Sequence, residues 1–195
     1  MSDATAAVWI VDASRLGRLG LKGPAAADWL RSVRIPVPER ANSWAPLVPG
    51  DGASAWPLVA RLGTSEFFIE TESDSALLDD LGRALGDGQD HVYPVLREDH
   101  ACVLGGRGVE HVLAQVCNLN LPSLPLQLNP VVLTLMTGVA VLVVAQAHGD
   151  GQRYRIWCDP SFGRYLWNTL RAIVVESGGD ELGVEQLRMT ERGQQ

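Results

Sequence analysis

The chain has 195 residues, of which 46% are hydrophobic and 20% are charged, and its formal net charge is −7. This balance is typical of a globular protein with a buried core, and it excludes an intrinsically disordered chain. The pI is near 5.0 and no basic stripe is present, so the chain does not have the charge pattern of a nucleic-acid-binding protein.

The first half of the chain predicts a strand, a helix, a hairpin and a second helix. Gly23-Pro24 follows a strand expected over residues 16–22. Proline is tolerated in the first turn of a helix because its missing N–H would have no partner there. Residues 39–57, rich in Pro, Gly, Ala and Asn, predict a long irregular connection. The later elements expected in this half are a hairpin, residues 58–62 and 66–70, and a leucine-striped helix, residues 73–85.

The second half predicts a similar order. A turn is expected at residues 148–151, and a final helix is expected to begin near Pro160. The other expected elements are a strand over 101–104, a helix over 109–117, a long strand over 131–144 with a bulge at Gly138, and a return strand over 154–158.

Two segments read as divergent copies of one unit: LGRLGLKGPAAADWL at residues 16–30 and ACVLGGRGVEHVLAQV at residues 101–116. Each passes from an apolar strand through glycine into a helix, and the order β-α-β-β-α follows twice. We therefore predict an α+β fold of two pseudo-repeated halves. The halves are expected at residues 11–88 and 89–178 of one compact domain, followed by a polar, partly disordered tail at 179–195.

From the sequence we expect neither a catalytic site nor a metal site. Its four histidines lack metal-ligand spacing, and Cys102 and Cys117 fall at positions typical of small core residues. Cys158 precedes Asp159, whose charge disfavours a thiolate. The glycines of the duplicated unit fail the spacing of phosphate-binding loops, so close packing is the favoured interpretation.

Widely spaced cysteines, odd in number, fit a reducing compartment better than a disulfide framework. The longest apolar run, residues 131–144, has 14 residues, fewer than the roughly 20 needed to cross a bilayer. The amino terminus also lacks the basic start of a secretory signal. We expect a cytoplasmic protein with no membrane partner.

Two groups of residues are candidate interaction sites. Residues 118–130 read NLNLPSLPLQLNP, in which prolines favour an extended path with alternate leucines on one side. These leucines either cover the core or form a patch that contacts another subunit. Trp44 and Trp56 flank the irregular connection, where they either pack within the loop, line a ligand pocket or contact a partner. The candidate interface leucines are Leu119, Leu121, Leu124, Leu126 and Leu128.

The opening of the chain resembles glycine-cleavage T-protein (aminomethyltransferase) domains. The similar residues are Asp12-x-Ser14 and then Gly17-Arg18-Leu19-x-Leu21-x-Gly23-Pro24-x-Ala26-Ala27-x-Trp29-Leu30. The second half resembles the gamma subunit of heterotetrameric sarcosine oxidase. Its best landmarks are Tyr154-x-Ile156-Trp157 and Phe162-Gly163-x-Tyr165-Leu166-Trp167. The resemblance covers roughly residues 11–178.

The resemblance implies the folate-binding-domain fold of these proteins without their catalytic residues. Residues 134–156 keep neither the tyrosine nor the glutamate of the corresponding T-protein stretch, and no aspartate matches the transferase's catalytic one. In the oxidase family the flavins FAD and FMN, and the folate, belong to larger subunits. The resemblance therefore implies a non-catalytic accessory subunit, partnered by larger flavoprotein subunits or by itself. A small stand-alone tetrahydrofolate-binding transferase is the alternative.

Overall fold

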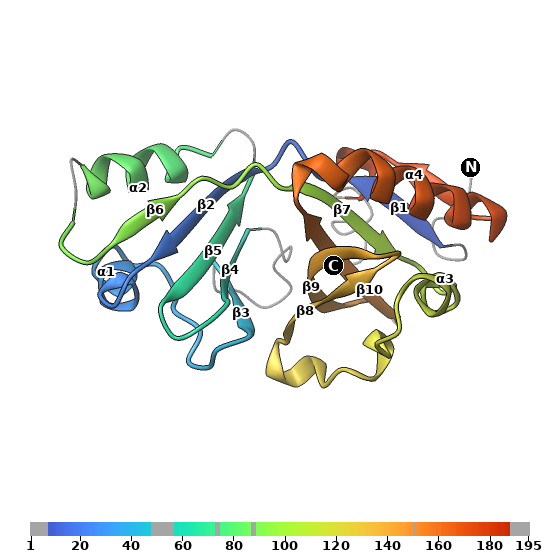
Figure 1. Cartoon of the computed structure of the whole chain (residues 1–195), viewed down its shortest axis with the longest axis horizontal. Helices are drawn as coiled ribbons and strands as arrows, with labels where there is room; N and C mark the ends of the chain where they lie inside the picture. The colour runs from blue at the N-terminus through green and yellow to red at the C-terminus, as the bar shows by residue number, and fades with distance from the viewer. Residues whose placement is uncertain (1–7, 48–56, 73–74, 87–88, 150, 188–195) are drawn as a thin grey trace. The chain divides into compact units, whose positions relative to one another are not determined.

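A computed structural model describes residues 8–47, 57–72, 75–86, 89–149 and 151–187. The chain divides into two compact units, each with its own sheet (Figure 1). Unit 1 comprises Met1–Ser14 together with Asp99–Gln195, and unit 2 comprises Arg15–Glu98. Unit 1 is therefore discontinuous in sequence, because the chain leaves it after Ser14 and re-enters it at Asp99.

Unit 1 is built on a six-stranded sheet in the order β11-β1-β7-β10-β9-β8. Its neighbouring strands are antiparallel except for the parallel pair of β1 and β11. β1 lies between β7 and β11, so the amino-terminal strand is an interior strand of the sheet that the carboxyl-terminal half forms. The strands are β1 (Trp9–Asp12), β7 (His100–Gly105), β8 (Val131–Met136), β9 (Val139–His148), β10 (Gly151–Cys158) and β11 (Asp180–Leu182).

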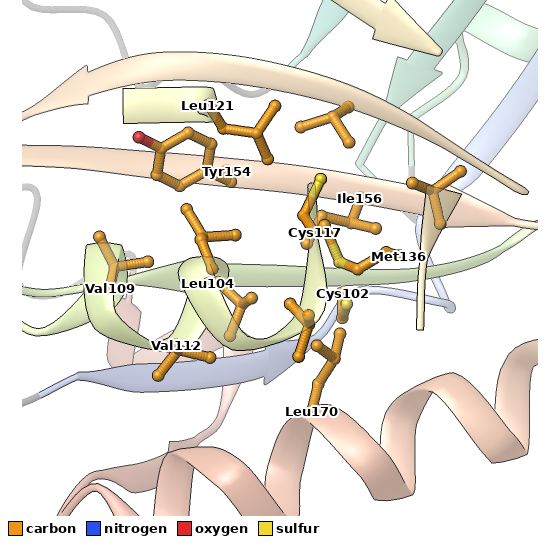
Figure 2. Packing of buried hydrophobic residues seen from close by; sticks show 14 of the residues in the cluster. Cys102, Leu104, Val109, Val112, Cys117, Leu121, Met136, Tyr154, Ile156 and Leu170 are labelled. Atoms are coloured by element: carbon orange, nitrogen blue, oxygen red, sulfur yellow. The ribbon is translucent and has the colours of Figure 1, made fainter. Parts of the chain in front are cut away.

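Two helices, α3 (Val109–Val116) and α4 (Pro160–Glu176), bury their apolar stripes in the core of unit 1. Figure 2 shows Leu104 and Ile156 of the sheet in this core, together with Val112 of α3 and Leu170 of α4. All four side chains are fully buried. Burial of such apolar surface is the main favourable contribution to the folding of this unit.

α4 begins where the sequence predicts it, because two signals for a helix start coincide there. The Asp159 carboxylate accepts a hydrogen bond from the Ser161 backbone N–H at 2.9 Å, and Pro160 occupies the first turn. The hydrogen bonds from Ser161, from its side chain and then its backbone, lower the pKa of Asp159. The cap is therefore formed by the charged carboxylate at neutral pH.

Unit 2 is built on a five-stranded antiparallel sheet in the order β3-β4-β5-β2-β6. Its helices α1 (Ala26–Ser32) and α2 (Leu77–Leu85) contribute residues to one core with the sheet, for example Leu30 and Leu81 beside Phe67. The strands are β2 (Gly17–Lys22), β3 (Ser43–Pro46), β4 (Leu58–Arg61), β5 (Glu66–Thr71) and β6 (Tyr93–Val95).

A buried ion pair lies on the other face of the unit 2 sheet. Arg18 and Glu70 stand directly opposite each other in the register of β2 and β5, and Arg18 Nε lies 2.6 Å from Glu70 Oε2. Their side chains are only 2% and 1% exposed. Since a charge is costly to bury without a partner, each of these residues requires the other.

Glycines at the strand-to-helix connections serve close packing. A Cβ atom on Gly105, at the end of β7, would lie 2.2 Å from the Trp9 ring. Gly23 has φ +131°, and a Cβ atom there would lie 2.0 Å from the His91 carbonyl oxygen. No larger residue fits either position without a shift of its neighbours.

Two sequence predictions of local structure are wrong. Residues 131–144 form not one bulged strand but a hairpin of β8 and β9, joined by Thr137 and Gly138 with φ 49° and 84°. Both central residues of such a tight hairpin turn need positive φ, and Thr-Gly is a weaker signal for it than Asn-Gly. The connection expected to be irregular contains β3, which pairs with β4. The first part of the tail expected at residues 179–195 is folded: it contains β11, and Leu187 is buried. Residues 188–195 lie outside the described residues.

Two further strands escape the sequence prediction because they are short. β1 has four residues and β6 has three, too few for an alternating pattern to be recognised. The mixed α+β class is confirmed. The halves expected at residues 11–88 and 89–178 differ from the compact units, since β1 belongs to the sheet formed by residues after 99.

Replacing Arg18 by alanine is expected to lower the free energy of unfolding by about 3–5 kcal/mol, because Glu70 then loses its buried cation. Urea unfolding followed by circular dichroism measures this change. Arg31→Ala is the matched control, because Arg31 and its partner Asp28 are 56% and 85% exposed. Its effect should stay below about 1 kcal/mol. Equal losses for the two variants would contradict the buried-pair interpretation.

Candidate interaction surface

The leucine-rich segment is a folded connection between α3 and β8. Two 3-10 turns, η1 (Leu121–Ser123) and η2 (Leu126–Leu128), replace the extended path expected from the prolines. Leu121 is completely buried in the core of unit 1, where Figure 2 shows it near Tyr154. Leu124 and Leu126 are partly buried against the same core. These three of the five candidate leucines therefore cover the core.

The other two candidate leucines are exposed, and they flank an exposed strand. Leu119 is 41% exposed and Leu128 is 42% exposed. Leu128 lies shortly before β8 in the chain, and the Cys117–Met136 bridge brings the segment of Leu119 to the other end of β8. Leu133 and Leu135 of β8 are 66% and 60% exposed. We call these four residues the β8 edge surface, because β8 is the last strand of its sheet.

A long uncharged segment contains the β8 edge surface. Residues 111–149 include no Asp, Glu, Lys or Arg, although 20% of the whole chain is charged. About eight charged residues would be expected in 39 positions at that frequency. Burial explains the lack of charge in β9, but not in the exposed positions of the loop and β8. Depletion of charge at exposed positions is typical of the centre of a protein–protein interface.

This charge gap is a signal in the sequence that includes Leu133 and Leu135, which the leucine pattern of residues 118–130 misses, but it does not separate them from the buried residues of β9. The sequence predicts one bulged strand over residues 131–144 in place of the hairpin, and that prediction does not single out the two leucines as exposed. Their exposure depends on β8 being an edge strand, which is a property of the sheet order.

The two candidate tryptophans do not join this surface. Trp44 belongs to β3 of unit 2, where it pairs with Ala60 and is partly buried. Its indole nitrogen is buried, and none of the described residues provides a hydrogen-bond partner for it. Trp56 lies outside the described residues.

A polar feature of unit 1 is the Ser14 clasp, in which Ser14 contacts His100 and Ala101 of β7. Ser14 Oγ lies 2.8 Å from His100 Nδ1, accepts a hydrogen bond from the Ala101 N–H at 3.1 Å, and lies 3.2 Å from the Ala101 carbonyl oxygen. The Ser14 N–H donates in turn to the Asp12 carboxylate at 2.9 Å. These bonds give the Asp-x-Ser motif a structural role: it fixes the chain where it leaves unit 1.

The clasp is held from the helix side by close packing. The His100 ring meets Trp167 of α4 edge-on, with the ring centroids 6.2 Å apart. A Cβ atom on Gly163 would lie 2.6 Å from the His100 Cβ. A serine beside a histidine is also the geometry of a nucleophile and its base. Here, however, backbone groups engage the Ser14 oxygen as well, so the arrangement favours an anchoring role.

The cysteines are buried thiols without the environment of a nucleophile. Burial raises the pKa of Cys102 far above its ordinary value, and Cys158 and Asp12 add to the effect. Burial, and then the charges of Asp159 and Asp99, raises the pKa of Cys158 to about 11. Because the thiolate is the reactive form, these two residues are poor nucleophiles at neutral pH. All three cysteines are free of disulfides and buried.

The described part of the chain contains no cluster of three or more His, Cys, Asp or Glu residues placed to hold a metal ion. None of its helices is long and apolar enough to cross a membrane. A shallow groove between α3 and α4 is lined by His111, Gln115, Ile173, Glu176 and Ser177. Its lining is mainly polar, unlike the apolar pockets that usually bind cofactors.

Comparison with known proteins identifies the fold. No protein-family model matches the chain, and no curated protein matches it. A solved structure of heterotetrameric sarcosine oxidase from Corynebacterium sp. U-96, in complex with pyrrole 2-carboxylate, contains a similar chain with a TM-score of 0.69 and 24% identity. The match covers 93% of each chain. The protein has the fold of this sarcosine oxidase chain.

A more distant match is aminomethyltransferase T of the glycine cleavage system from Bartonella henselae, with a TM-score of 0.56 and 16% identity. It covers 86% of this chain but only 46% of the transferase, so the chain spans about half the length of that enzyme. Both proteins were expected from the sequence motifs, and the structural matches confirm the resemblance at the level of fold.

Replacing Gly163 by alanine is expected to lower the free energy of unfolding by about 1–3 kcal/mol, because the new methyl group overlaps His100. Gly82→Ala is the matched control: Gly82 is also helical, but a Cβ atom there meets nothing within 4 Å. That change should raise stability by about 0.5–1 kcal/mol. Urea unfolding measures both, and stabilisation by both substitutions would show that His100 is not tightly packed.

Raising the pH above 9 is expected to lower the stability of the protein. The pKa of Cys158 rises from 9.0 to about 11 on folding, so the unfolded chain loses this proton first. The contribution is complete below pH 9 and is lost as the pH rises through 11. Urea unfolding across this range should show a shallower decline for Cys158→Ser than for the natural protein. An identical decline would exclude a contribution from Cys158.

Proposed function

We propose that the chain is a non-catalytic accessory subunit of a sarcosine-oxidase-like oxidoreductase complex, in which larger partner subunits hold the flavins and the folate. The observation that carries the proposal is the match to a chain of heterotetrameric sarcosine oxidase over 93% of both chains. A match over nearly the full length of both chains supports an equivalent part in an assembly, whereas a shared domain in a longer enzyme would not. The proposed subunit corresponds to gamma.

The side chains of unit 1 support a role in contact rather than in chemistry. The β8 edge surface presents exposed leucines within a segment that has no charged residue. The Ser14 hydroxyl is engaged by backbone groups, and burial raises the pKa of the Cys102 and Cys158 thiols. Ser14 and the cysteines, the residues that could act as nucleophiles, therefore stabilise the fold. The exposed leucines of the β8 edge surface are available to contact a partner.

A second candidate is a small tetrahydrofolate-binding, aminomethyltransferase-like protein that acts alone. The similarity to aminomethyltransferase T over 86% of this chain favours it. The match spans 46% of the transferase, so the similarity by itself supports a shared domain rather than the activity of the whole enzyme. The two candidates differ in what the isolated chain can bind.

Purification of the affinity-tagged chain from its native host tests the proposal. We expect a stoichiometric complex with flavin absorbance and sarcosine-dependent oxygen consumption, and we expect the isolated chain to lack both. Titration of the isolated chain with tetrahydrofolate, followed by calorimetry, is the second arm. A chain that purifies alone and binds tetrahydrofolate would overturn the accessory role in favour of the transferase-like candidate.

A further inference from the structure

The two sheets end in four edge strands, and one of them differs from the rest. β11 has three residues, two of them acidic, while β6 and β3 have three and four residues and each contains a proline. Short strands, charges and prolines are the usual features that keep an edge from pairing with another chain. β8 has six residues, Val131–Met136, with neither a charge nor a proline. It is therefore the one described edge without these protections.

The backbone of β8 has free pairing capacity on the side away from β9. Met136 and Val139 close a two-residue turn, so these two residues form a hydrogen-bonded pair. Hydrogen-bonded and non-hydrogen-bonded pairs then alternate along β8 and β9. The N–H and C=O groups of Val131, Leu133 and Leu135 consequently point outward. In the described part of the chain, the pairing on this side is one bridge between Met136 and Cys117, at the end of the strand.

The exposed side chains of β8 define what the strand can accept. Leu133 and Leu135 are two positions apart and so project from the same face of the sheet. Leu119 and Leu128 add exposed apolar surface at its two ends. A strand that pairs with β8 needs apolar side chains next to Leu133 and Leu135. Because β8 and its neighbouring segment carry no charged residue, the added strand gains nothing from charged side chains of its own.

We propose that β8 is the docking strand of this subunit, and that an extended, uncharged, apolar segment of a partner subunit adds to it as a further strand of the unit 1 sheet. Main-chain hydrogen bonds to Leu133 and its outward-facing neighbours supply affinity in this mode of recognition, and the leucines supply specificity. The inference rests on the proposed function, because it names where the partner subunit binds.

A partner subunit fits this edge better than a second copy of the chain. Two copies would each carry a net charge of −7 and repel each other. Self-pairing would also join strands of only six residues, about 20 Å long. A stable dimer normally buries about 1,600 Å² in total. A larger subunit can bury additional surface around the added strand, including Leu119 and Leu128.

The double variant Leu133→Lys with Leu135→Lys tests the docking strand. Both side chains are exposed, so the fold should tolerate the change, and charged side chains on an edge oppose strand addition. Leu96→Lys is the matched control, because Leu96 is 80% exposed and lies in unit 2. The tagged chains are purified from the native host, and bound flavin per chain is measured. We expect a loss of at least about tenfold for the double variant, and none for the control.

Hydrogen–deuterium exchange of the purified complex provides an independent measurement. The amides of Leu133 and Leu135 should exchange much more slowly in the complex than in the isolated chain. If the double variant does not fold by circular dichroism, this comparison on the natural protein decides the question.

The outcomes separate the two proposals. Equal flavin in the natural protein and the double variant, with no slowing of these amides, would overturn the docking strand and leave the accessory function intact. Absence of a flavoprotein from the natural protein would overturn both. A dimer of the chain that dissociates in the double variant would show that a second copy occupies the edge, and would overturn the partner-subunit proposal.

Discussion

The pairing of β1 between β7 and β11 is the constraint on which the organisation of this protein depends. It places residues 9–12 inside a sheet whose other strands all follow residue 99, so unit 1 cannot be completed until both ends of the chain have come together. Closing such a long loop costs conformational entropy, which the pairing and burial of β1 in unit 1 must offset. The Ser14 clasp lies where the chain leaves unit 1, and it ties that point to His100 and Ala101, just after the chain returns. Unit 2 is thereby an insertion between two neighbouring positions of unit 1.

The resulting order of strands also determines which residues of unit 1 are exposed to solvent. With β1 and β11 at one side, β8 is left at the opposite edge, where the described residues provide one bridge, between Met136 and Cys117. The neighbouring connection covers the core with Leu121, Leu124 and Leu126 and leaves Leu119 and Leu128 exposed. One uncharged segment therefore completes a hydrophobic core and presents an apolar edge. If the chain is the accessory subunit proposed above, its fold and its partner contact share the same residues.

Much of the local structure could be predicted because its causes are local. Pro160 and Asp159 specify the start of α4, and leucine spacing specifies α2. The β4–β5 hairpin forms where two apolar runs flank the Gly-Thr-Ser segment at residues 63–65. The leucine-rich segment was partly predictable: its leucines were recognised as unusual, but their division between core and surface depends on contacts with α3 and the sheet. Leu133 and Leu135 were missed because an edge strand and an interior strand can have the same apolar sequence.

The sequence by itself determined the mixed α+β class, the positions of the longer helices, the glycines needed for close packing, and the resemblance to sarcosine oxidase and aminomethyltransferase T. These features depend on spacing and residue type within short segments. Only the tertiary structure decided that β1 and β11 complete the sheet of unit 1, that Arg18 and Glu70 neutralise each other in the interior, and that β8 is an edge strand. Such features join residues far apart in the chain. Their energies come from long-range pairing and burial, which no local pattern records.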